Sequence, residues 1–130
     1  MTKTLNERPQ GLLVIDVYFD LDRAPGAGRC FVRPNTLVVP VGTYRLVWNL
    51  ITIGDGAADR PASFGEVALE GSLMPVVSSG GVSATQWQAE IENPGGELRP
   101  EGYHVAVEHG GETVICYPHV IGSPDQGGGG

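Results

Sequence analysis

The chain has little positive charge and almost no lysine. Its 130 residues include 8 basic and 15 acidic side chains, for a formal net charge of -7, and Lys3 is the single lysine. Proteins that bind nucleic acid do so largely through basic side chains that neutralise phosphates. This charge balance therefore argues against nucleic acid, and against an anionic membrane surface, as the partner.

Cysteine and long apolar runs are also scarce. Cys30 and Cys116 are the two cysteines, and a chain of this length buries roughly two thirds of its unfolded surface without a disulfide framework. No apolar run approaches the roughly 18 residues of a membrane span, and residues 1–10 lack the apolar core of a signal peptide. We therefore expect a cytoplasmic protein, and the sequence leaves open whether Cys30 and Cys116 pair.

No segment keeps a helical period, whereas 20 glycines and 10 prolines punctuate runs rich in valine, isoleucine and threonine. This pattern predicts an all-β fold, a Greek-key β-sandwich of about seven to eight strands. The domain spans residues 11–122, between an N-terminal extension of residues 1–10 and a flexible glycine-rich tail of residues 123–130. The expected strands are residues 12–19, 30–39 with a break at Pro34, 44–53, 64–69, 73–77, 83–91, 103–108 and 112–117.

The last two strands are predicted to form a hairpin. The pair Gly110-Gly111 supplies the positive φ angles of a two-residue turn. That turn places His109 opposite Glu112 and Val105 opposite Cys116. Cys116 then points into the core, and His104 points away from it.

The end of this hairpin carries the one suggestive motif, Val114-Ile-Cys116-x-Pro118-His119. It resembles the last strand of blue-copper proteins, of the cupredoxin-like family, in which a cysteine thiolate and two histidines hold copper with a weak axial methionine. The resemblance implies Cys116 and His119 as two copper ligands. No methionine follows His119, and the family's first histidine ligand is missing, because Trp48-Asn49-Leu50 stands where it is expected. The resemblance therefore favours a metal-free member. An immunoglobulin-like sandwich is the alternative fold.

Three other patterns have a chemical and a structural interpretation. Asp16, Asp20 and Asp22 carry the carboxylates that calcium prefers, but they lack the glycine-centred spacing of a calcium loop. A solvated acidic edge is therefore the favoured interpretation. Trp48 and Trp87 could stack on a sugar, although both fall on apolar strand faces and core packing is favoured. Cys116 lies among valines rather than in the electropositive setting of a catalytic thiolate.

The sequence predicts a non-catalytic binding module, with a protein as partner. Its expected contact surface is either the sheet edge of residues 30–39 or the loop of residues 54–63. The first alternative is a copper-binding electron carrier that uses Cys116 and His119. The second is a conjugated modifier of the ubiquitin type, attached through Gly130. The sequence identifies neither the partner nor the oligomeric state.

Overall fold

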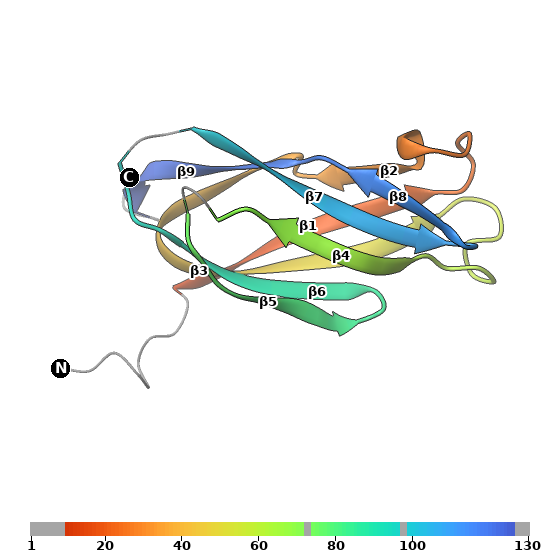
Figure 1. Ribbon diagram of the computed structural model, residues 1–130, viewed down its shortest axis with the longest axis horizontal. Helices are drawn as coiled ribbons and strands as arrows, with labels where there is room; N and C mark the ends of the chain where they lie inside the picture. Colours follow the sequence, from red (N-terminus) through yellow and green to blue (C-terminus); the bar gives the residue numbers. More distant parts are fainter. Residues whose placement is uncertain (1–9, 72–73, 97–98, 127–130) are drawn as a thin grey trace.

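The computed structural model describes residues 10–71, 74–96 and 99–126 and confirms the all-β prediction (Figure 1). A single turn of 3-10 helix, Ala27–Arg29, follows the first strand. Within the described residues, no helix is long and apolar enough to cross a membrane. The described strands are β1 Gly11–Asp20, β2 Cys30–Arg33, β3 Thr36–Ile53, β4 Ser63–Leu69, β5 Val76–Ser83, β6 Gln86–Asn93, β7 Pro100–His109, β8 Glu112–Cys116 and β9 His119–Gln126.

The strands form two layers that share β3. In the first sheet the order is β2-β1-β3-β6-β5. In the second sheet β4 pairs with β7, and β7 pairs with β8 along one half and with β9 along the other. The beginning of β3 pairs with β9. The result is a mixed, sandwich-like sheet that nearly closes on itself.

The long strand β3 passes from one layer to the other. Residues 36–41 lie parallel to β9, and residues 42–53 lie between β1 and β6. Its register shifts between Val39 and Val41, and Gly42 follows with φ of 125°. The break expected at Pro34 is confirmed, because β2 ends at Arg33 and β3 begins at Thr36. The gap expected between residues 39 and 44 was wrong: the strand continues through Gly42, because glycine accepts the positive φ at the bend.

The core fills the space between the layers, as the alternation of apolar residues predicted. Ile15, Val17 and Phe19 of β1 are fully buried. Trp48 is also buried, and its Nε1 donates to the hydroxyl of Tyr103 on β7 at 3.1 Å. The two rings meet edge to face with centroids 5.8 Å apart. This contact links the layers, and it satisfies the polar atom of each buried ring.

The predicted hairpin is confirmed in its register. His109 lies opposite Glu112, and Val105 lies opposite Cys116. Gly110 and Gly111 have φ of 59° and 83°. Cys116 is therefore on the buried face, and His104 is on the outer face, where its ring lies 6.3 Å from that of Tyr117.

The strands before this hairpin differ from the prediction. We expected residues 73–77 and 83–91, whereas the structure has β5 at Val76–Ser83 and β6 at Gln86–Asn93. The expected strands left out residues 78–82, which β5 includes. Gly81 remains in β5 because it packs on the ring of Trp87: a Cβ there would lie 3.1 Å from the indole.

The expected loss of structure after Ile121 was also wrong, because β9 extends to Gln126. The buried Asn93 holds this strand: its Nδ2 donates to Val39 O at 2.8 Å and to Ser123 O at 2.9 Å. The flexible tail was expected at residues 123–130. Residues 127–130 lie outside the described residues, so attachment through Gly130 stays a prediction.

Candidate functional site

The sequence placed a copper ligand at Cys116, but in the structure this residue forms a disulfide with Cys30, with the Cα atoms 5.9 Å apart. The bond joins β2 of the first sheet to β8 of the second, and both cysteines are buried. A disulfide sulfur is not the thiolate that blue-copper sites require. Copper binding through Cys116 therefore remains a prediction for the reduced protein alone.

His119 lies on the other side of the second sheet from Cys116. It is exposed at the start of β9, opposite Gly102 of β7. Gly102 and His119 both line a cavity of about 340 Å³, together with Glu70, His104 and Tyr117. Among the described residues, no three or more His, Cys, Asp or Glu side chains are grouped so that they could hold a metal ion.

A second candidate site lies at one end of the sandwich, on the right of Figure 1. The β1–β2 connection, the β3–β4 connection and the β7–β8 turn come together there. We call these segments, residues 21–29, 54–62 and 109–113, the loop end. The first two are directly bonded, because Asp22 Oδ1 accepts a hydrogen bond from the backbone N–H of Asp55 at 2.9 Å. Gly54 packs closely on the same loop: a Cβ there would lie 2.9 Å from the Asp22 nitrogen.

Two arginines fix the shape of the first loop. Arg29 donates from Nε to Arg23 O at 2.9 Å and from a terminal nitrogen to Leu21 O at 3.2 Å. Arg23 donates to Gly28 O at 3.0 Å and forms an ion pair with Asp20 at 3.4 Å. Its guanidinium also lies 4.6 Å from the centroid of the Phe31 ring. The loop is therefore held by its own side chains rather than by regular pairing.

The hairpin turn is joined to the second loop through His109. Its Nε2 lies 3.0 Å from Arg60 O, and its ring lies 5.3 Å from that of the buried Phe19. A cavity of about 460 Å³ opens beside it, between Pro61 and Ser63 on one side and residues 108–113 on the other. All three segments are thus tied to one another or to the core.

The loop end is predominantly acidic. Its exposed carboxylates, with that of the adjoining Glu108, outnumber its exposed guanidiniums, which belong to Arg23 and Arg60. These carboxylates are exposed, so their charges are in contact with solvent. The exposed acidic residues are Asp22, Asp55, Asp59, Glu108 and Glu112.

The sequence offered Asp20 and Asp22 as calcium ligands, and it gave no role to the two arginines of the first loop. The carboxylates of Asp20 and Asp22 serve as acceptors for loop backbone, the former from Asp22 N at 2.9 Å. Arg23 and Arg29 had no recognisable signal because they bond nearby backbone carbonyls, which every residue carries. The partner of His109 is a backbone carbonyl 49 residues away in the chain.

The tryptophans do not form a sugar platform. Trp48 is fully buried and Trp87 is half-buried, with its Nε1 bonded to Ser79 Oγ at 3.0 Å. The other expected contact surface, residues 30–39, begins with β2, on the side of the sandwich that the Cys30–Cys116 disulfide bridges. These placements leave the loop end as the candidate site.

No protein-family model matches the chain, and no curated protein matches it. Among solved structures, a cysteine protease inhibitor from Entamoeba histolytica is similar over 88% of this chain and 97% of its own, with 5% identity and a TM-score of 0.39. A similarity of that degree identifies neither a family nor a function.

Proposed function

We propose that this protein is a non-catalytic binding module that recognises another protein through its loop end. The observation that carries the proposal is the direct bond between two loops, from Asp55 N to Asp22 Oδ1. Loops that a rigid scaffold holds in one arrangement lose little conformational freedom on binding, which favours recognition.

The composition of the loop end supports a protein partner with a basic surface. Four exposed carboxylates of the loop end, with that of the adjoining Glu108, outnumber its two exposed guanidiniums. Complementary charge raises the association rate and is screened by salt. Binding should therefore weaken as ionic strength rises.

The absence of catalysis is part of the proposal. Burial raises the pKa of Tyr103 to about 12. Its hydroxyl is in the core and bonds Trp48, so this shift reflects packing between the layers. The disulfide also favours an oxidising compartment over the cytoplasm that the sequence suggested, because disulfides are rare in reducing compartments.

The test is affinity capture of proteins that carry a basic patch, using the source organism's exported fraction as the sample. The test variant Asp59→Arg/Glu112→Arg changes two exposed carboxylates of the loop end. The control variant Glu66→Arg/Glu92→Arg changes two exposed carboxylates elsewhere by the same charge. We expect one binder that wild type and the control retain and that the test variant retains at least tenfold less.

Two results would contradict the proposal. A binder that the test variant retains as well as wild type does not use the loop end. A binder that both variants lose equally responds to net charge rather than to a defined surface.

A further inference from the structure

The strand β5, far from the disulfide side of the sandwich, forms an open edge of the first sheet. Among the described strands it pairs with β6 alone. Residues 77–83 are exposed along their whole length. Every second residue of an edge strand directs its N–H and C=O groups outward, where another strand can bond them.

The other sheet edges carry features that discourage pairing. β2 has four residues and ends before Pro34, and β4 presents the exposed Glu66. The first part of β3 is bounded by Pro34 and Pro40. Charge, proline, short length and β-bulges are the usual means by which edges avoid one another, and the bulges of β5 are confined to its two ends. β5, with the sequence VVSSGGVS, has neither charge nor proline.

The middle of β5 is regular and firmly held. Its two register shifts lie near its ends, between Val76 and Ser78 and between Gly81 and Ser83, so residues 78–81 pair regularly with β6. Trp87 of β6 holds this stretch through its bond to Ser79 Oγ and its packing beneath Gly81. The edge is therefore already in the conformation that pairing requires.

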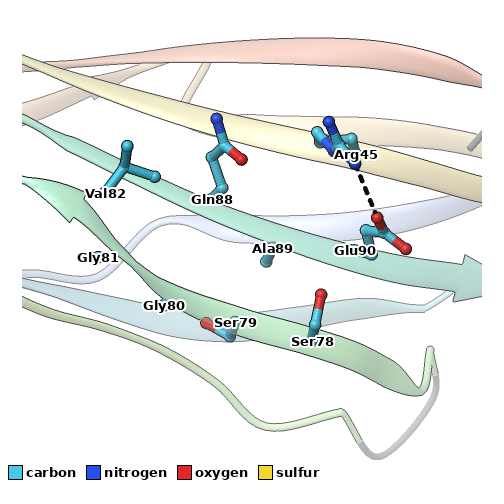
Figure 2. Close-up of a pocket in the computed structure, with 9 residues that line it drawn as sticks. All are labelled: Arg45, Ser78, Ser79, Gly80, Gly81, Val82, Gln88, Ala89 and Glu90. Atoms are coloured by element: carbon cyan, nitrogen blue, oxygen red, sulfur yellow. Dashed lines mark hydrogen bonds and ion pairs between the residues drawn. The ribbon is translucent and has the colours of Figure 1, made fainter.

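A groove of about 270 Å³ runs beside this edge on the outer face (Figure 2). Arg45 of β3 and the neighbouring Glu90 of β6 both line it and form an ion pair at 3.0 Å, so this part of the lining carries balanced charge. Ser78 and Gly80 are small, so the groove has room for a side chain from an added strand. Val82 lies at the end of the groove and is 56% exposed.

We propose that β5 pairs antiparallel with β5 of a second copy of this chain, about a twofold axis at Gly80. The chain carries a net charge of -7, so most of its surface repels a second copy, whereas β5 brings no charge to the contact. Pairing Gly80 with its symmetry mate sets Ser79 of each copy opposite Gly81 of the other within the regular stretch, and Val82, in the bulge that follows, borders the contact where it lines the groove. The backbone groups of both edges are then satisfied by identical strands.

This interface is small for a permanent dimer, so self-association should be weak and dependent on concentration. The proposal is independent of the loop end, which lies outside the contact. A protein can therefore be a dimer through β5 whether or not the loop end binds a partner.

Sedimentation velocity over a wide concentration series tests the proposal with two matched variants. Val82→Lys places a charge on β5, and Val38→Lys does the same on β3 at nearly equal exposure, 55% against 56%. We expect wild type and Val38→Lys to dimerise alike, and Val82→Lys to dimerise at least tenfold more weakly. Ser78→Glu tests the same edge through a second residue, and thermal melting confirms that each variant is folded.

Three results would overturn the proposal. Wild type could remain monomeric at all concentrations, or Val38→Lys could lose the dimer while Val82→Lys keeps it. Equal weakening by both substitutions would mean that added charge, rather than the β5 edge, governs association.

Discussion

At the scale of single residues, the Cys30–Cys116 bond has the widest consequence. It links residues 86 positions apart in the chain and ties the edge of one layer to the other. Cross-linking distant residues restricts the unfolded chain more than the folded one. The same bond converts the proposed copper ligand into a structural residue. The sequence allowed the pairing but could not establish it, because it does not reveal which strand edges meet.

Reduction of this disulfide should destabilise the fold by about 2 to 5 kcal/mol. The measurement is urea unfolding with and without a reductant, with the double variant Cys30→Ala/Cys116→Ala as a control that should not respond to reductant. Equal unfolding midpoints for wild type with and without reductant would show that the bond does not stabilise the fold. Two free thiols in the untreated protein would show that the bond does not form.

The Tyr103 hydroxyl predicts a fall in stability at alkaline pH. Burial raises its pKa from 10.0 to about 12, while the hydrogen bond from Trp48 acts in the opposite direction. The folded state thus holds this proton more tightly than the unfolded state does. The contribution of the protonated Tyr103 hydroxyl to the free energy of unfolding is complete below pH 10. As pH rises towards 12, the free energy of unfolding falls by roughly 2 to 3 kcal/mol.

Urea unfolding from pH 9 to 12 measures this fall. Tyr103→Phe is the control, because it removes the titrating group and keeps the ring, at a cost of about 1 kcal/mol for the unpaired Trp48 N–H. The variant should lose less stability over this range than wild type. Parallel pH profiles for the two proteins would rule out Tyr103 as the cause.

At the scale of elements, neighbouring glycines in β5 have different surroundings. A Cβ at Gly81 would meet the Trp87 ring at 3.1 Å, whereas a Cβ at Gly80 would meet no atom within 4 Å. The sequence shows only a Gly-Gly pair, which resembles the turn at Gly110-Gly111. The Trp87 ring on the neighbouring strand keeps Gly81 in a strand rather than a turn. The residues next to Gly81 in the sequence do not reveal this contact.

Gly81→Ala should therefore melt below Gly80→Ala. Crowding of the indole costs about 1 kcal/mol, whereas alanine in open space at position 80 removes the entropy cost of glycine. Thermal melting of both variants beside wild type, at a concentration where the protein is monomeric, measures the difference. Equal melting temperatures would mean that the Trp87 ring moves aside freely.

At the scale of the whole molecule, the apolar alternation predicted more of the fold than of the site. Ile15, Val17 and Val105 could be assigned to the core because burial follows the period of two along a strand. The pairing of β3 with both layers and the extension of β9 depend on long-range bonds, such as those of Asn93. The loop end could be predicted only as loops, since its order comes from side chains bonded to distant backbone.

The account's central claim is that the loop end is the recognition surface. Hydrogen–deuterium exchange of the protein with and without a captured partner tests it most directly. We predict that added protection falls on residues 21–29, 54–62 and 109–113. Protection confined to β5, or to the cavity around Gly102 and His119, would contradict the claim and place recognition on a sheet.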